Sequence, residues 1–487
     1  MTSLSSTAGL RKLAAISVVL LCGCPGTPPE TKTVARPFRG QEVELVVPAS
    51  YQLPALWDVA LNEWMDQSGA TVRWSEYTGN AEKSLETKLS APVTSGGRVI
   101  LFPLRQLGAL DRHLNPIEAA ATTGLDLKDV FKGLHDRVVS RNRSPVAIPV
   151  SAPVLLCYYR AALLKAAGLK PPQTWDEYQS LLDSLDRWAP GLTAVEPLAP
   201  GHRATLFFAR SLAFAKHPEN YSVWFDLDSG KPLLKTAGFE EAMEVAGRAW
   251  KKMPCRITEM TPADCRRQIL EGKAALAIGI EPVSVDKAGE AKRAASIEIG
   301  ICRLPGSRRV FNPNSNQWDM LPRSAVHAPA LCAFDGMAVG VGLPAEGGKD
   351  AAAWHLLSTL AGDQFASNWA SLPKSPCRES QVGTATSWNE SGLTVDESSR
   401  AIDATAQVLR DDQLVAELPI PYAAKFRRVT DEAIWTMMQR HELDPAAAIQ
   451  QLQSDFEHIV SRKGAAAMRA DYRRGLGLPP APADSRP

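Results

Sequence analysis

The sequence has almost no excess charge of either sign. Its 487 residues include 54 Lys and Arg against 53 Asp and Glu, a formal net charge of +1. Because nucleic-acid binding needs a basic surface, this balance gives no sign of a nucleic-acid partner. The hydrophobic share of 45% and the ordinary glycine content exclude a wholly disordered or collagen-like chain. The composition indicates a large globular protein with material for two or three domains.

Sequence motifs for catalysis and metal binding are also scarce. No His-x-x-x-His or Cys-x-x-Cys pair, Walker loop or Gly-x-Ser-x-Gly elbow is present. Residues 340–345 imitate a dinucleotide-binding turn, but Pro344 occupies the stretch that should open its helix. Residues 226–230 lack the later glutamate of a calcium loop and are better explained as a hairpin turn. We expect a protein without metal, cofactor or enzymatic activity, although two opposed carboxylates for glycoside hydrolysis stay open.

The cysteines are expected to pack as small apolar residues rather than to act as metal ligands or reactive groups. Cys157 and Cys332 lie in apolar runs, where a thiol usually packs as a small hydrophobic group. Cys255 and Cys265 could pair in an oxidising compartment, and the sequence leaves this open. His355 lies within a helical pattern and is expected to be structural.

Near the N-terminus, Arg11 and Lys12 precede a short apolar run over residues 13–21. The run is shorter than the roughly 20 residues that span a bilayer and is typical of a secretory signal. Residues 21–24, Leu-Cys-Gly-Cys, resemble a bacterial lipobox. We therefore expect a signal peptide over 1–23, lipid such as palmitate on Cys24, and a Pro- and Thr-rich tether over 24–39. The alternative is cleavage by an ordinary signal peptidase without lipidation.

From residue 42 the pattern alternates between strand and helix. Strands are predicted at 43–47, 71–74 and 98–102, with helices near 56–65 and 81–89 between them. This alternation favours parallel β-α-β units, whose ligands bind beyond the carboxyl ends of the strands. Those ends lie near Tyr51, near Glu76 and Tyr77, and near Phe102.

Beyond residue 145 the sequence predicts further strands and helices. Thr174 and Glu177 have the spacing of a capping box, with Gly168 ending the helix before it. Further strands are predicted at 146–150, 274–280, 297–301 and 337–341. Further helices are predicted at 350–360, 430–440 and 445–460.

Five segments in order resemble the family 1 extracellular solute-binding proteins of bacterial ABC importers, the maltose- and sugar-binding group. The strongest is residues 156–178, where Tyr-Tyr precedes a helical stretch ending Ala-Gly-Leu and then Pro-Pro-Gln-Thr-Trp-Asp-Glu. The others are Gly-Lys-Ala-Ala-Leu-Ala-Ile-Gly at 272–279, Ile-Gly-Ile-Cys-Arg-Leu-Pro-Gly at 299–306, Asp-Ala-Ala-Ala-Trp-His-Leu-Leu at 350–357 and Ser-Pro-Cys-Arg-Glu-Ser at 375–380.

The resemblance implies an α/β, two-lobe periplasmic-binding-protein-like fold of type II, each lobe a β-sheet flanked by helices, with a multi-segment hinge. It places the N-terminal lobe at 40–150 and 326–378 and the C-terminal lobe at 153–325 and 395–475. The Pro- and Ala-rich composition at the end of the sequence separately predicts a disordered tail at 476–487. The protein would be a monomeric, non-enzymatic lipoprotein at the extracytoplasmic face of the envelope. Its partners would be a polar solute, most simply a sugar, the permease subunits of an ABC transporter, and the membrane through its lipid anchor.

By position in the family, the resemblance implies ligand contacts at Tyr51, Glu76, Tyr77, Phe102, Ser151, Phe207, Glu281, Phe334, Asp335 and Phe426. Aromatic faces and carboxylates together suit the C–H faces and hydroxyl rim of a sugar. Two departures weaken a sugar specificity. Glu281 stands where sugar-binding members have an aromatic residue, and Phe334-Asp335-Gly336 replaces a tryptophan turn, so a cationic or polyol ligand fits as well. An envelope hydrolase acting on glycosides and a solute-binding sensor or scaffold are the alternatives.

Overall fold

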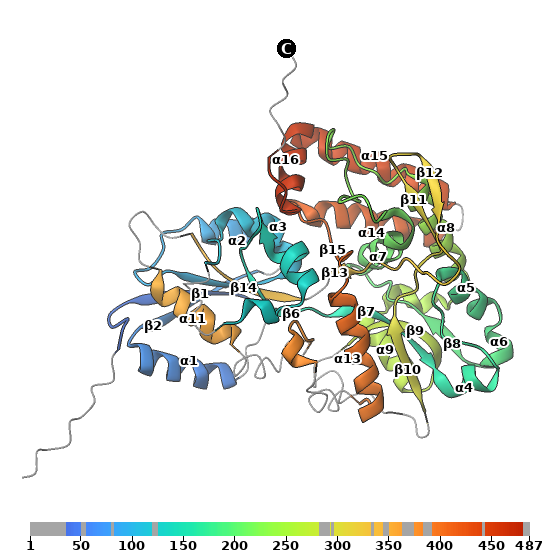
Figure 1. Ribbon diagram of the computed structural model, residues 1–487, viewed down its shortest axis with the longest axis horizontal. Helices are drawn as coiled ribbons and strands as arrows, with labels where there is room; N and C mark the ends of the chain where they lie inside the picture. The colour runs from blue at the N-terminus through green and yellow to red at the C-terminus, as the bar shows by residue number, and fades with distance from the viewer. Residues whose placement is uncertain are drawn as a thin grey trace, which may run out of the picture. The chain divides into compact units, whose positions relative to one another are not determined.

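Two mixed β-sheets, of five and four strands, organise the protein in the computed structural model (Figure 1). The structure describes residues 36–49, 55–78, 82–118, 125–281, 293, 297–332, 336–343, 350–362, 375–382, 392–440 and 444–480. All of them belong to one unit of the chain, residues 36–487.

The first sheet begins as the predicted parallel β-α-β arrangement. In spatial order its strands are β2 (Thr71–Tyr77), β1 (Glu42–Pro48), β3 (Arg98–Pro103), β14 (Met337–Val341) and β6 (Ile148–Ser151). β1 pairs in parallel with β2 and β3, and α1 (Ala55–Ser68) and α2 (Glu82–Leu89) form the connections. β14 returns from far along the chain and pairs antiparallel with β3 and β6.

Alternation along β1 explains why helices cover both faces of this sheet. Val43 and Leu45 belong to one buried cluster, together with Trp57 of α1 and residues of α11 (Ala351–Ala361). Val46, one residue out of phase, belongs to the other core, which includes Leu85 of α2. Successive side chains of a strand point to opposite faces, so each face buries its own apolar row. Figure 1 shows α1 and α11 on one side of the sheet and α2 on the other.

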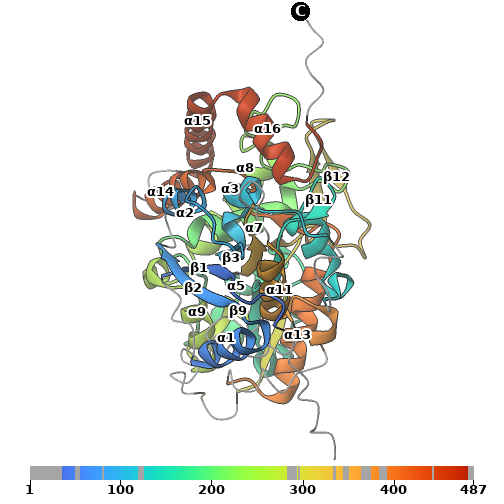
Figure 2. The same cartoon turned by 90° about the vertical axis from the view of Figure 1, so that its left-hand side faces the viewer.

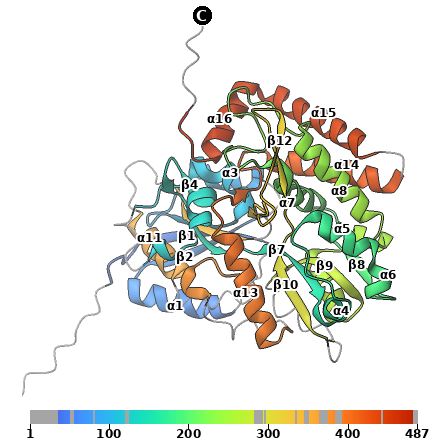
Figure 3. The same ribbon diagram turned by 45° about the vertical axis from the view of Figure 1, so that its right-hand side comes forward.

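The second sheet is mostly antiparallel. Its order is β10 (Ile299–Arg303), β7 (Val154–Arg160), β9 (Ala274–Glu281) and β8 (Thr193–Val195). Only β8 and β9 run parallel. α13 (Val395–Leu409) packs against β10 and β7 (Figure 3), and α9 (Pro262–Leu270) packs against β9. Residues 152–153 alone separate β6 from β7, so the chain passes directly from one sheet to the other there.

The predicted helix boundary after β7 is confirmed. α4 (Ala161–Ala166) is followed by its C-cap Ala167 and then by Gly168, whose φ of 67° is left-handed and therefore favours glycine. α5 (Trp175–Asp183) opens with the predicted capping box, because Thr174 Oγ1 accepts from the Glu177 amide and Glu177 accepts from the Thr174 amide.

A layer of helices packs beyond the second sheet. It comprises α7 (Arg203–Ala215), α8 (Ala237–Trp250), α14 (Ala423–Arg440), α15 (Pro445–Lys463) and α16 (Ala465–Gly475). The last three lie together in Figure 2. Phe225, Phe426, Phe456 and Tyr472 stack among them in edge and offset contacts, which anchors α16 to this layer.

α16 also touches elements next to the first sheet. Arg474 Nε lies 3.3 Å from Asp111 Oδ1, and Asp111 Oδ2 accepts from Arg141 Nε at 3.0 Å. α16 makes a second contact with the segment around Trp224, where the Tyr472 hydroxyl accepts from the Trp224 amide at 3.2 Å. This one helix therefore contacts both the flank of the first sheet and the helical layer.

Short elements complete the described chain. They are α3 (Leu107–Leu110), α6 (Leu185–Trp188), a π-helical turn (Leu134–Val139), β4 (Ser140–Arg141), β5 (Ser144–Pro145), β11 (Arg309–Asn312), β12 (Gln317–Met320), β13 (Leu331–Cys332), β15 (Val415–Ala416) and the 3₁₀ turns η1 (Leu104–Gln106), η2 (Asp111–His113), η4 (Leu127–Asp129), η6 (Cys255–Glu259) and η7 (Glu379–Gln381).

Several local predictions need correction. The strand predicted at 297–301 is β10, two residues further on, and the helix predicted at 430–440 begins at Ala423. Cys255 and Cys265 do not pair: both are free thiols, Cys255 exposed on η6 and Cys265 buried in α9. The turn predicted at 226–230 is confirmed, because Asp226 N and Gly230 N close it by hydrogen bonds to Lys231 O and Asp226 O.

Candidate functional site

Four of the predicted site residues fall outside the described part of the chain. They are Cys24, Tyr51, Phe334 and Asp335. The other residues that were expected to contact a ligand can be placed.

Three predicted residues lie where the parallel strands of the first sheet end. Glu76 is exposed near the end of β2. Tyr77 beside it is buried, and its hydroxyl donates to Leu101 O at 3.2 Å. Phe102 is fully buried near the end of β3. The structure therefore brings these three to one edge of the sheet, with Glu76 facing solvent.

The remaining predicted residues are buried. Ser151 Oγ, on β6, accepts from the Met337 amide at 3.1 Å. Phe207 packs against Phe208 and Phe239 in the helical layer, and Phe426 packs against Phe225 and Phe456. Met337 of β14 lies opposite both Pro103 and Ser151, so Ser151 lies at the same edge of the first sheet as Phe102. Phe207 and Phe426 lie in the helical layer, and a contact of each of these three residues with solute stays a prediction.

Glu281 lies at the end of β9 in a buried ion pair. Its Oε1 accepts from Arg266 Nε of α9, and both side chains are at most 2% exposed. Burial raises the pKa of Glu281, while the Arg266 charge opposes that rise. The carboxylate is thus already engaged by a cation of the protein itself.

A second group of charged side chains, which sequence reasoning missed, gathers where the first sheet meets the helical layer. Its centre is Glu417, just after β15, with Arg427 and Asp431 from α14, Thr205 from α7 and Arg105 from η1; we call these five residues the Glu417 cluster. Glu417 is 4% exposed. The members come from four separate parts of the chain, so no spacing in the sequence indicates them.

The geometry around Glu417 leaves one of its oxygens only loosely engaged. Thr205 Oγ1 donates to Oε2 at 2.9 Å, whereas Arg427 Nη1 lies 3.8 Å from Oε1, beyond hydrogen-bond range. Burial raises the pKa of Glu417, and the charges of Arg427 and Arg105 lower it in part. A buried carboxylate with an oxygen that accepts no hydrogen bond is suited to accept one from a ligand hydroxyl or ammonium.

The cluster sits at the carboxyl edge of the first sheet because η1 follows β3 directly. Next to η1, α3 packs so closely on the segment after Glu417 that a Cβ on Gly108 would lie 2.3 Å from Ile420 N. Only glycine fits this approach, which holds Arg105 near Glu417. Ligands of open α/β sheets bind beyond such strand ends.

Beside the cluster, α14 also positions an aromatic surface. Asp431 accepts from the amides of Gly201 and Ala204, the latter at 2.7 Å, and so fixes the start of α7. The guanidinium of Arg203 lies 4.6 Å from the ring centre of Trp435, which is 39% exposed. A partly exposed indole next to charged groups provides a face for an apolar ligand surface.

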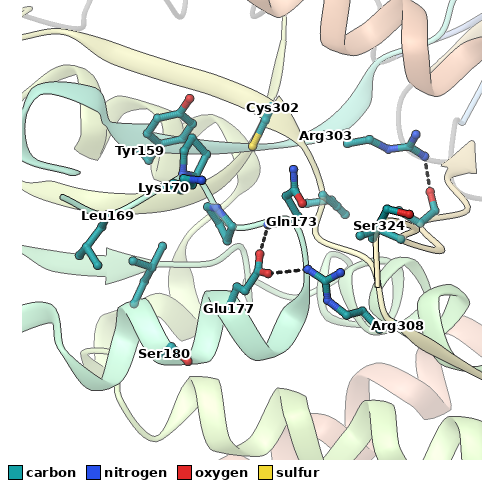
Figure 4. Close-up of a pocket in the computed structure, with 16 residues that line it drawn as sticks. Tyr159, Leu169, Lys170, Gln173, Glu177, Ser180, Cys302, Arg303, Arg308 and Ser324 are labelled. Atoms are coloured by element: carbon teal, nitrogen blue, oxygen red, sulfur yellow. Dashed lines mark hydrogen bonds and ion pairs between the residues drawn. The ribbon is translucent and has the colours of Figure 1, made fainter. Parts of the chain in front are cut away.

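A separate pocket of about 920 Å³ opens on the second sheet (Figure 4). Tyr159, Cys302 and Arg303 come from its strands, and Lys170, Gln173 and Glu177 come from α5 and the loop before it. Glu177 Oε1 accepts from Arg308 at 3.0 Å across the pocket wall. Of the predicted site residues that the structure describes, none lines this pocket.

Metal-ligand and membrane signatures are not found in the described residues. Among them, no three His, Cys, Asp or Glu side chains are placed to hold a metal ion. Likewise, no helix in the described ranges has the length and hydrophobicity that a bilayer crossing requires.

Comparison with solved structures identifies the architecture. The sugar-binding protein MalE of Xanthomonas citri aligns with 87% of this chain and 98% of its own, with a TM-score of 0.61 and 18% identity. Maltose-bound MalE3 of T. maritima aligns with 86% and 99%, with a TM-score of 0.60 and 15% identity. The chain has the fold of the type II periplasmic binding proteins.

The same fold is shared with a solute-binding protein of an ABC transporter from Agrobacterium radiobacter K84, solved in complex with ribitol. It aligns with 87% of this chain and 100% of its own, with a TM-score of 0.58 and 16% identity. No protein-family model and no curated protein matches the chain. The type II fold predicted from the sequence is thereby confirmed, while these identities establish the fold alone.

Proposed function

We propose that the protein is the substrate-binding lipoprotein of an ABC importer, which captures a polar solute, most simply a sugar or polyol, and delivers it unaltered to the permease. The type II fold and neighbours described as bound to maltose and ribitol support this proposal. Lipid on Cys24 would keep the protein beside its transporter in the cell envelope.

The Glu417 cluster is the observation on which the proposal rests. Hydroxyl-rich solutes need acceptors, donors and a flat apolar face. Glu417 supplies an acceptor, Arg105 and Arg427 supply donors, and Trp435 supplies the face. We propose that these groups form the solute site together with the edge residue Glu76.

The proposed movement is a hinge motion between two lobes, 40–150 with 326–378 and 153–325 with 395–475. Arg105 would belong to the first lobe, and Thr205, Glu417 and Arg427 to the second. A solute that contacts both lobes only in the closed state favours closure. The direct passage from β6 to β7 is one of the hinge segments in this proposal.

The remaining sequence-predicted residues form a second part of the proposal. Tyr51, Phe334 and Asp335, with the buried set Tyr77, Phe102, Ser151, Phe207, Glu281 and Phe426, are proposed to border the solute or to support the residues that do. Single alanine variants separate the two roles when their affinity is measured by titration calorimetry and their Tm by thermal denaturation. Loss of a residue that borders the solute should lower the affinity at an unchanged Tm, whereas loss of a supporting residue should lower Tm.

A thermal-shift screen against sugars, polyols and polyamines tests the function. Ligand at 100 times its Kd stabilises the native state by about 2.7 kcal/mol, so a true ligand raises Tm clearly. We expect Arg427→Ala to weaken that ligand's binding at least tenfold. Arg428→Ala is the matched control, because Arg428 adjoins Arg427 in the sequence and its own side chain is 72% exposed. Absence of any stabilising solute, or conversion of a solute to product, would contradict the proposal.

The lipid anchor is tested separately. Mass spectrometry of the mature protein from bacterial membranes should find an acylated N-terminal cysteine at position 24. A Cys24→Ala variant should be released into the soluble envelope fraction, whereas Cys22→Ala should stay with the membrane. Equal release of both variants would argue for ordinary cleavage.

A further inference from the structure

Two cysteines face each other across the second sheet. In the antiparallel pairing of β7 with β10, Cys302 lies directly opposite Cys157. Directly opposed residues of an antiparallel pair project from the same face of the sheet. Both cysteines are free thiols here.

The backbone geometry of such a pair is compatible with a disulfide. Opposed residues of antiparallel strands have Cα atoms about 4.5 or 5.5 Å apart, depending on their place in the hydrogen-bond ladder. Disulfides span Cα separations of about 4.4–6.8 Å. Either kind of pair therefore falls within the range, so the strands need not separate for the bond to form.

The pocket of Figure 4 gives one of the two sulfurs access to solvent. Cys302 is partly exposed and lines that pocket beside Tyr159, whereas Cys157 is fully buried. Gly300 makes this arrangement possible, because a Cβ there would lie 2.0 Å from the Tyr159 ring. An oxidant that enters the pocket thus meets Cys302 first.

Cys157 is protected from unassisted oxidation. Its hydrogen bond to Cys302 and its burial raise the pKa of its thiol well above the usual value. The thiolate is the reactive form, so Cys157 reacts slowly with a distant oxidant. Cys302 Sγ, once it is part of a mixed disulfide, however, lies within reach of Cys157.

We propose that Cys157 and Cys302 are a cross-strand redox pair that closes to a disulfide when a small disulfide oxidant, such as oxidised glutathione, enters the pocket. The Cys302 thiolate attacks one sulfur of the oxidant and releases one glutathione thiolate. Cys157 then attacks Cys302 Sγ and releases the second. The two thiol protons and two electrons leave with two molecules of glutathione, so the step balances.

The bond would tie the edge strand β10 to β7, the strand that receives the chain from the first sheet. Cross-linking positions so far apart in the sequence restricts the unfolded chain strongly. The inference is independent of the proposed solute, since it needs only a compartment that supplies disulfide oxidant.

Peptide mapping of the native protein tests the pair. The folded protein is incubated with oxidised glutathione and blocked with N-ethylmaleimide. It is then unfolded with a second, isotope-labelled portion of N-ethylmaleimide, digested without reductant and analysed by mass spectrometry. We expect one principal linked species that joins the peptides of Cys157 and Cys302 and disappears with dithiothreitol. Buried Cys332 and Cys377 should carry only the maleimide added after unfolding.

Two variants and one reference sample sharpen the test. Cys255→Ser should keep the link, and Cys302→Ser should lose it; should Cys302→Ser not fold, the wild-type map decides alone. A urea-unfolded sample gives the pattern of random pairing. A native map without the 157–302 link, with a lasting glutathione adduct on Cys302, or with the random pattern would overturn the proposal.

Discussion

Arg266 and Glu281 show how strongly a single buried charge depends on its partner. Arg266 is 2% exposed and Glu281 is fully buried, and each is the other's counter-ion. Moving such groups out of water costs several kcal/mol, which only their mutual attraction and hydrogen bonds offset. Removing one partner therefore leaves an uncompensated charge in the core.

Arg266→Ala should lower the free energy of unfolding by about 3–5 kcal/mol, because Glu281 is left without its cation. Urea denaturation at pH 7 measures the loss. Arg267→Ala is the control: its side chain is 36% exposed and pairs with Asp264 on the helix surface, so the cost should stay below about 1 kcal/mol. Equal losses for the two variants would contradict the interpretation.

Lys216, at the end of α7, should give stability a distinctive dependence on pH. Burial lowers the pKa of its ammonium from 10.5 to about 8, although its Nζ donates to His217 O at 3.0 Å and Gln413 Oε1 at 3.1 Å. Between these two pH values the unfolded chain holds the proton and the native chain does not. Stability must then rise with pH, on the order of 1.4 kcal/mol per unit from this group.

The prediction is checked by urea denaturation of wild type and Lys216→Met between pH 7.5 and about 10.5. The free energy of unfolding of the wild type should increase relative to that of the variant as pH rises above 8. Below pH 8 the difference between the two free energies should not change with pH. Lys251→Met replaces an exposed lysine and provides the control. A wild-type advantage that shrinks with rising pH would refute the assignment.

Within the described ranges, three helices begin with capping boxes, and the acidic members of these boxes differ sharply in burial. Glu177 of α5 is 43% exposed, whereas Glu397 of α13 is 1% exposed. Glu397 also accepts from the Ile299 amide at 2.8 Å and pairs with Arg293 at 2.8 Å. The capping box of α5 thus stabilises the start of its helix, whereas the capping box of α13 also joins that helix to the edge strand β10.

Glu177→Ala should cost about 1 kcal/mol, the usual size of a helix cap. Glu397→Ala should cost about 3 kcal/mol or more, since it leaves a buried amide and Arg293 without their acceptor. Thermal denaturation measures the loss of stability in each variant. The two losses can be compared directly, because each residue is the third helical residue of a capping box. Similar losses would mean that the contact with β10 contributes little.

The elements were predicted well where their signal is local. β-branched and apolar runs such as 43–47 mark buried strands, and the capping box at Thr174 fixes a helix start, so both were found. The antiparallel insertion of β14 between β3 and β6 could not be predicted, because no local pattern specifies a pairing between residues 337–341 and strands near 100 and 150.

The candidate site was harder still. Glu417, Arg427, Thr205 and Arg105 are ordinary polar residues in their own segments, and only the tertiary fold brings them together. Position within the resembled family directed attention to aromatic residues such as Phe207 and Phe426, which the structure places in the core.

Across the described body, α16 couples parts that are distant in the chain. Its Tyr472 and Arg474 reach the segment around Trp224 and the side chain of Asp111. A close approach reinforces this: a Cβ on Gly475 would lie 1.6 Å from Pro419 O. Both regions should therefore lose order together when the helix is removed.

Truncation after Gly464 should increase amide hydrogen exchange in residues 222–225 and in 111–113, while β2, which α16 does not touch, keeps its protection. Hydrogen-exchange mass spectrometry gives both regions in one measurement. Arg473→Ala serves as a mild control, because its guanidinium donates only to the backbone of Pro479 in an exposed position. Exchange that rises in one region alone would mean that the helix does not couple them.

The placement of α16 has a practical consequence for anyone who wishes to label or display this protein. A tag fused directly after α16 would adjoin a helix on which two regions depend, so a bulky fusion at that position should loosen both. The tight connection between β11 and β12, where Asn316 has a φ of 55° and residues 314–317 are exposed, offers a safer insertion point for an epitope or fluorophore.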